Sequence, residues 1–424
     1  MNILDIINKK RFKEKLSNEE IDYVVKNLDT DEVTDYQLSA LLMAICINGM
    51  EEEEIYQLTD SIIKSGEEID LSNITGKKVD KHSTGGVGDK TTLVLLPLVA
   101  SCGVLTPKMS GRGLGFTGGT IDKLESIPGF KVSLSLEEMK EKLAIHGLAL
   151  ACQTPNLVPA DKKIYALRNA TATASSLPLI VSSIMSKKIA SGADGIIMDL
   201  KIGNGSLFKS IEEAREFATY AIQIGKNYNR KVICVFTDMN QPLGNAIGNS
   251  LEVLESIEVL KNEGPKDVRN LCIVLATFMV SFGLNISISE ANNLVLENLH
   301  NGKAYEKFLE FISSQGGEVK NIVVSEKCIS VKSKESGFVN TIKTDKLGEL
   351  VRRLGGGRYH KDDEINYGVG VVLACKCGDF ITEDEEILKI YMGDKDIPID
   401  EFLECFEISM SGGKLNPLIY EVKN

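Results

Sequence analysis

The chain has 424 residues, more than a single hydrophobic core usually supports, so we expect two or three domains. Apolar residues make up 43% and charged residues 25% of it, the usual balance for a soluble globular protein. The net charge of −12 argues against a nucleic-acid-binding protein, whose contact surface would be basic. An acidic protein that carries a local cluster of lysines and glycine N–H groups fits a small anionic ligand better than a nucleic acid.

The cysteines and the apolar runs indicate a cytoplasmic protein. The nine cysteines are scattered and include no C-x-x-C pair, so we expect reduced thiols and neither a disulfide framework nor a zinc site. The first residues, MNILDIINKKRFKEKLS, contain no signal-peptide core. The longest apolar runs, residues 93–104 and 272–280, are too short and interrupted to span a bilayer, so no membrane partner is expected.

Residues 1–66 carry helical signals only. Ser17 and Glu20 form a capping-box pattern before IDYVVKNL, and Gly49 is placed to end the next helix. That second helix carries a wide apolar stripe, which needs a partner in this chain or in a second subunit. The stripe consists of Leu38, Leu41, Leu42, Ile45 and Ile47.

From about residue 78 the pattern changes to alternating strands and helices. The predicted strands are KKVDKHS, LTPKMS, LALAC, ADGIIMDLK and KVICVFTD, and later helices are predicted near 210–225, 251–261 and 267–283. This order is typical of an α/β fold with a mostly parallel sheet and helices on its faces.

The sequence therefore predicts three domains. A small all-α domain comprises residues 1–66 and is completed by a helical insert at 158–192. A large phosphate-binding α/β domain comprises 78–157 and 193–329, and a C-terminal α+β domain comprises 330–424. We expect a cleft between the first two domains, where small-molecule sites often lie.

Two glycine-rich loops, residues 85–88 and 111–119, each follow a predicted strand and lead into a predicted helix. Glycines allow backbone N–H groups to approach an anion closely, and a helix N-terminus favours negative charge. Neighbouring lysines and hydroxyls add donors. The first loop is not a nucleotide P-loop, because Asp89 separates Gly88 from Lys90. Together the loops predict a site for one phosphate-sized anion.

Three other features suggest chemistry. His82, one of four histidines, directly precedes the first glycine loop and is placed to handle a proton. Ser183 and Lys187 lie four residues apart on one helix, and with Arg168 they offer donors to a flat heterocycle, although a solvated face is the simpler interpretation. The segment 239–255 contains backbone carbonyls and Glu255, oxygen ligands of the kind that bind a hard cation. The spacing of these groups alone is weak evidence for such a site.

The motifs KHSTGGVGDKTTLVL and KMSGRGLGFTGGTIDKLESIPGF closely resemble the signature of the pyrimidine nucleoside phosphorylases and thymidine phosphorylases. ADKKIYALR, SSIMSKKIASGAD and DMNQPLGNAIGN are also similar to that family, so that the resemblance covers nearly the whole chain. It implies a pentosyltransferase that cleaves uridine, thymidine or deoxyuridine with phosphate, reversibly, to a free pyrimidine and a (deoxy)ribose 1-phosphate. It also implies hinge closure, a homodimer packed through the N-terminal helices, and no organic cofactor.

The resemblance further implies roles for individual residues. His82, Arg168 and Lys187 would be catalytic and would stabilise the departing base, with His82 protonated. The nucleoside would be bound by Arg168, Ser183, Lys187 and Phe116. Phosphate would be bound by Lys81, Ser83, Thr92, Lys108, Ser110 and Thr120. A potassium ion would be held by backbone groups of Gly88 and Lys90, the carbonyls of Leu243 and Ala246, and Glu255.

Some positions depart from the family pattern. Phe116 stands where the family usually has histidine, which we expect to affect the preference for sugar or base, or to lower activity. Lys90 replaces a common threonine, and Asn204 and the run 206–208 also differ. The alternatives are a thymidine-restricted phosphorylase, a phosphoribosyltransferase of similar fold, which would require acidic residues for magnesium near the loops, and a weakly active or non-catalytic nucleoside-binding homologue.

Overall fold

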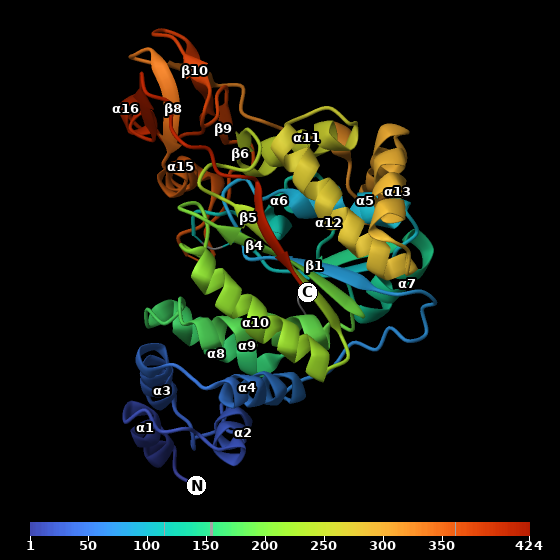
Figure 1. Cartoon of the computed structure of the whole chain (residues 1–424), viewed down its shortest axis with the longest axis vertical. Coiled ribbons are helices and arrows are strands. Elements are labelled where there is room, and N and C mark those ends of the chain that lie inside the picture. Colours follow the sequence, from blue (N-terminus) through green and yellow to red (C-terminus); the bar gives the residue numbers. More distant parts are fainter. Residues whose placement is uncertain (114, 153–155, 361) are drawn as a thin grey trace.

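The computed structural model describes residues 1–113, 115–152, 156–360 and 362–424. Leu114, within the second glycine loop, lies outside the described residues. Figure 1 shows the N-terminal helices at one end of the molecule, the main sheet in the middle and the C-terminal strands at the other end.

The N-terminal region consists of α1 (Ile3–Arg11), α2 (Asn18–Lys26), α3 (Asp35–Asn48) and α4 (Glu52–Lys64). The capping box of Ser17 and Glu20 is present, and Gly49 ends α3 with a φ of 74°. Two later helices, α8 (Pro159–Ala170) and α9 (Leu177–Ala190), pack on α3 and α4. The predicted stripe finds its partner partly within the chain, because four of its five residues are buried in this shared core and Ile47 is 72% exposed.

The main sheet is mostly parallel, as predicted. Its strands β1 (Val79–Ser83), β4 (Gly195–Ile202) and β5 (Lys231–Asp238) are parallel neighbours in that order. A second parallel pair, β2 (Thr106–Ser110) and β3 (Leu148–Cys152), is joined to the first by a bridge between Lys78 and Leu105. The carboxyl ends of β1 and β2 therefore lie close together, which brings the two glycine loops to the same edge.

Helices cover both faces of the sheet because its strands are apolar on both sides. On β4, Ile196, Met198 and Leu200 pack with α9 and α10 (Ile211–Asn227), whereas Ile197 packs with the helices of the other face. Those helices are α5 (Thr91–Ser101), α6 (Thr120–Glu125), α11 (Asn249–Leu260), α12 (Lys266–Leu284), α13 (Ile288–His300) and α14 (Lys303–Ser314), while α7 (Leu136–His146) packs on β3.

Within the described residues, α12 alone has the length and apolarity to cross a bilayer. Its residues Leu271, Leu275 and Met279 are buried in the core against α5 and the sheet. The helix therefore serves here as a core helix.

The C-terminal region contains two small antiparallel sheets. One has the order β6-β9-β11-β7 and the other β10-β8-β12. The elements are β6 (Ala246–Ile247), η1 (Val319–Asn321), β7 (Cys328–Lys332), β8 (Gly337–Ile342), α15 (Thr344–Val351), η2 (Arg352–Gly356), β9 (Gly370–Leu373), β10 (Phe380–Ile381), β11 (Glu386–Tyr391), α16 (Ile399–Leu403) and β12 (Phe406–Ser409).

The last strand corrects the predicted C-terminal domain of residues 330–424. β13 (Ile419–Lys423) returns to the main sheet and pairs antiparallel with β5, with Val422 opposite Val235. The chain therefore leaves the C-terminal region after β12 and completes the edge of the central sheet (Figure 1).

Candidate active site

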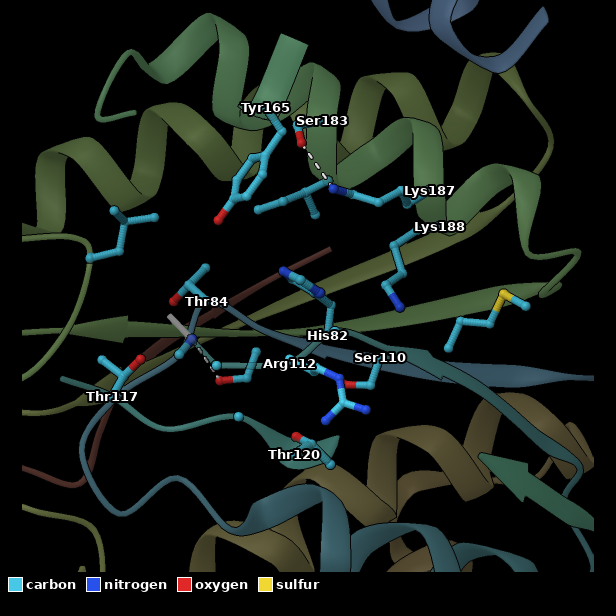
Figure 2. Close-up of a pocket in the computed structure, with 18 of the residues that line it drawn as sticks. His82, Thr84, Ser110, Arg112, Thr117, Thr120, Tyr165, Ser183, Lys187 and Lys188 are labelled. Carbon is cyan, nitrogen blue, oxygen red and sulfur yellow. Dashed lines mark hydrogen bonds between the residues drawn. The ribbon is translucent and has the colours of Figure 1, made fainter. Parts of the chain in front are cut away.

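A cavity of about 650 Å³ lies where the two glycine loops meet α8 and α9. Figure 2 shows Tyr165, Ser183, Lys187 and Lys188 on its helical side and Ser110, Thr117 and Thr120 on the opposite side, with His82 between them. The volume is in the usual range for a small-molecule site, roughly 300–1,000 Å³. The cavity therefore has two chemically different walls, one built by loops and one by helices.

The loop wall is an anion cradle. Five of the residues predicted to bind phosphate line the cavity, namely Ser83, Thr92, Lys108, Ser110 and Thr120. Thr92 lies in the first turn of α5, and Thr120 is the first residue of α6, so each glycine loop does lead into a helix N-terminus. Gly85 and Gly88 have φ values of 85° and 76°, a conformation that L-residues with side chains rarely adopt.

Lys81 is the exception among the predicted phosphate residues. Its side chain is fully buried behind the loop, where its ammonium donates to the Thr91 hydroxyl and lies 3.5 Å from Asp199 Oδ2. It is absent from the described residues that line the cavity. A contact between Lys81 and phosphate therefore requires a different position of its ammonium.

Two further lysines share one buried carboxylate at the floor of the cavity. Lys188 Nζ lies 2.6 Å from Asp80 Oδ2, and Lys108 Nζ lies 3.5 Å from Asp80 Oδ1. Burial lowers the pKa of Lys108 to about 7, despite Asp80 and with the help of the Lys188 and Lys81 charges. Below this pH, where both side chains are charged, two ammonium groups on one carboxylate leave a net positive charge, which favours an anion.

His82 occupies the centre of the site at the end of β1. Its removal from bulk water, followed by the nearby charges of Lys188, Lys108, Lys81 and Lys187, holds its pKa well below 6.5. The imidazole is therefore neutral at pH 7 in the unliganded site. Burial and the neighbouring lysines therefore oppose a protonated His82 in the empty site, and its protonation during catalysis stays a prediction.

The helical wall offers planar and charged donors. Lys187 Nζ donates to Asp161 Oδ2 at 2.7 Å and to Ser183 Oγ at 3.0 Å, so that the predicted pair does share a helix face. The buried Arg168 also lines the cavity, and its guanidinium donates to the carbonyls of Leu179 at 3.0 Å and Ala174 at 2.6 Å. These bonds fix the plane of the guanidinium.

Sequence reasoning missed several cavity residues. Asp161 and Tyr165 precede Arg168 at the i, i+4, i+7 spacing of a single helix face, and that spacing was a usable signal. Lys187 Nζ lies 5.4 Å from the centre of the Tyr165 ring. Arg112 carried no comparable signal, because its position depends on Glu125 in the folded chain.

Comparison with known proteins agrees with this geometry. Residues 75–305 match the α/β domain and residues 4–66 the helical bundle domain of a glycosyl transferase family, and residues 338–409 match the pyrimidine nucleoside phosphorylase C-terminal domain. The pyrimidine-nucleoside phosphorylase of Staphylococcus epidermidis is 46% identical over 432 residues, covering 100% of this chain and 99% of the relative. The chain belongs to the pyrimidine-nucleoside phosphorylase family.

Other relatives extend this result. The pyrimidine-nucleoside phosphorylase of Geobacillus stearothermophilus is 45% identical, with 99% of each chain covered. Among solved structures, anthranilate phosphoribosyltransferase from Thermus thermophilus has a TM-score of 0.57 at 17% identity, covering 74% of this chain and 99% of the other. At that identity the likeness concerns the fold alone.

The residue that departs from the family in the second glycine loop does not reach the cavity. Phe116 packs against the C-terminal core, with its ring next to Gly348 of α15. The same loop is tied to the C-terminal region by Arg358, which lies 2.5 Å from Asp122, and Asp122 in turn accepts from Gly113 N at 2.7 Å. The structure therefore gives Phe116 an anchoring position and no contact with the cavity.

The residues expected to hold potassium do come together, but they do not fit the ion. The side-chain ammonium of Lys90 lies among the oxygens of Leu243, Ala246 and Glu255, so the chain places its own cation there. Burial alone would lower the pKa of Lys90, but the negative charges of Glu255 and Glu252 have the larger combined effect and raise it. No step of the chemistry is therefore assigned to a metal ion.

Proposed function

We propose that this chain catalyses the reversible phosphorolysis of uridine, thymidine and deoxyuridine to the free pyrimidine and (deoxy)ribose 1-phosphate. The observation that carries the proposal is the pairing of an anion cradle on one wall of the cavity with Arg168, Ser183 and Lys187 on the other. Phosphate suits the first wall and the carbonyl groups of a pyrimidine suit the second.

The two walls divide the charges of the reaction. The electron pair of the bond between C1′ and N1 leaves with the base, a phosphate oxygen forms the new bond to C1′, and the base takes up a proton. Arg168 and Lys187 stabilise the negative charge that develops on the base. The phosphate on the opposite side stabilises the positive charge on the sugar.

His82 acts between these walls. In the unliganded site it is neutral and has one N–H to donate to the departing base. Bound phosphate offsets the charges of Lys108 and Lys188, which are among the causes of its lowered pKa, so the pKa of His82 rises when phosphate is present. The imidazole can then transfer a proton as the base leaves.

Closure of the two walls on the substrate completes the site and excludes water, which would otherwise capture the sugar cation. The helical wall is built by α8 and α9, which pack on α3 and α4, and α9 also packs against the main sheet. The proposed closure of an α domain on an α/β domain therefore has to move this shared packing.

We also propose that the chain forms a homodimer through α1 and α3. Tyr36, Met43 and Ile47 lie on one face of α3, and they are 74%, 37% and 72% exposed. An Ile47→Glu variant should be a monomer by light scattering, whereas the unchanged chain should have twice the monomer mass. A wild-type monomer contradicts this assembly.

Incubation with uridine or thymidine plus phosphate, followed by absorbance of the free base, tests the function. Cleavage of both nucleosides supports the broad substrate range, and cleavage of thymidine alone supports a thymidine-restricted enzyme. Binding without turnover identifies a non-catalytic homologue. The presence of His82, Arg168 and Lys187 at the cavity favours turnover.

A further inference from the structure

Lys90 lies two residues after the first glycine loop and directly precedes α5, and its side chain is fully buried. Its ammonium donates to the carbonyls of Leu243 at 2.7 Å and Ala246 at 3.0 Å, and to Glu255 Oε2 at 2.5 Å. An ammonium group has three N–H donors. Each of them has a partner here, so the oxygens surround a satisfied cation.

The remaining groups of this cage are also occupied. Glu255 Oε1 accepts from the N–H groups of Asn245 and Ala246, both at 2.9 Å. The two backbone carbonyls that the resemblance assigned to an ion, those of Gly88 and Lys90, accept from Lys90 N at 2.8 Å and Leu93 N at 2.9 Å. Each of these oxygens therefore already has a donor supplied by the chain itself.

Two glycines pack closely against the ammonium and its partners. A Cβ atom added at Gly244 would lie 2.7 Å from Lys90 Nζ and 2.2 Å from Glu255 Oε2. A Cβ atom at Gly88 would lie 2.5 Å from the carbonyl oxygen of Leu243. Contacts this short admit no side-chain carbon at either glycine, so the backbone packs directly around the Lys90 ammonium and its partners.

We propose that the ammonium of Lys90 takes the place of a structural monovalent cation, so that this chain needs no potassium ion to join its first glycine loop to the segment 242–246 and α11. The chain supplies the single positive charge that balances Glu255 and fixes the loop that leads into α5. The cation is covalently attached, so it cannot be lost by dilution or exchanged for sodium.

The same segment offers a matched comparison. Lys376, from the turn after β9, donates to the carbonyls of Pro242 and Gly244 and lies 3.1 Å from Asp267 Oδ2. It also joins two carbonyls and a carboxylate, but its side chain is 21% exposed, whereas that of Lys90 is fully buried. Loss of Lys376 therefore opens the site to water, while loss of Lys90 leaves an enclosed oxygen cage.

The first test compares the full-length wild-type chain in potassium chloride and in choline chloride, at about 0.1 M ionic strength, where both salts screen surface charges equally. We expect the same melting temperature and the same phosphorolysis rate in both. A melting temperature or rate that rises specifically with potassium overturns the proposal.

The second test removes the ammonium. Lys90→Ala and Lys90→Thr should lower the melting temperature in choline chloride by on the order of 5 °C, because Glu255 loses its buried partner. Potassium should restore much of this loss, and it should have no such effect on Lys376→Ala. Folded Lys90 variants that respond equally to both salts overturn the proposal, and if neither variant folds the wild-type comparison decides alone.

Melting temperature keeps this inference separate from the function. The rate measurement rests on the proposed phosphorolysis, but the thermal measurement does not. Absence of turnover in every salt, with the expected melting behaviour, contradicts the function and leaves the role of Lys90 supported.

Discussion

Lys188 on α9 and Asp80 on β1 form a buried ion pair, with Nζ 2.6 Å from Oδ2. The pair joins the helical wall of the cavity to the sheet, because α9 packs with the N-terminal helices and β1 carries His82 at its end. Asp80 also lies 3.5 Å from Lys108 Nζ. One carboxylate therefore positions a lysine from each wall.

Replacement of Lys188 by methionine should destabilise the protein by on the order of 3 kcal/mol, because it leaves the buried Asp80 carboxylate with only the Lys81 N–H at 2.7 Å and the Lys108 ammonium at 3.5 Å. The free energy of unfolding from urea titration measures this. Lys334→Met is the control, because Lys334 lies 2.7 Å from Asp400 but the two side chains are 71% and 73% exposed. Equal effects of the two changes would contradict a structural role for the buried pair.

Anion binding should weaken as the pH rises through neutrality. Lys108 has a pKa of about 7 in the empty site, so its ammonium is charged below that pH and neutral above it. Sulfate is a suitable probe because it stays a dianion between about pH 6 and pH 8, and its affinity should fall by up to about tenfold per pH unit.

The variant Lys108→Arg isolates this effect, because arginine stays charged throughout the range. Sulfate inhibition constants for the variant should depend on pH more weakly than those for the wild type. An unchanged pH dependence would assign the titration to another group.

His82→Ala should lower kcat by about 10²- to 10⁴-fold, the usual contribution of a well-placed proton donor. His82→Gln keeps a neutral N–H donor, so it should retain more activity than alanine if hydrogen-bond donation to the base contributes. Steady-state kinetics with saturating uridine and phosphate measure both variants. Equal loss in the two would show that only proton transfer matters.

Phe116→His should leave the ratio of uridine to thymidine kcat/KM within about twofold of wild type, because the ring packs on the C-terminal core and not in the cavity. Leu207 is the comparison, since its side chain lines the cavity and is 40% exposed. Leu207→Ala should raise the nucleoside KM. A large shift in preference from Phe116→His alone would place residue 116 at the substrate.

Local patterns predicted the parts of the site that are local in the chain. Ser83 and Thr120 were identifiable because strand, glycine loop and helix follow one another within a few residues. Lys90 was identified as part of a cation site through its backbone, whereas the structure uses its side chain. The side chain of Lys90 takes this position because Glu255 lies beside it in the folded chain, and a local sequence motif does not specify that contact.

Long-range pairings escaped the sequence analysis for the same reason. Nothing in ITEDEEILKIYM or in the last residues specifies that β13 will pair with β5 and that β11 will not. The lowered pKa of His82 likewise arises from burial in the folded chain and then from lysines on three separate elements. Alternating apolar residues identify a strand, but the choice of its neighbour depends on the whole fold.

The position of β13 has a consequence for how the protein is made. β5 lies near the middle of the chain, whereas its neighbour at the sheet edge, β13, is synthesised only after the entire C-terminal region. During translation the edge of β5 stays open, with unpaired backbone groups of the kind that promote association between chains. The nascent protein is therefore most exposed to misassembly while its central sheet awaits its last strand.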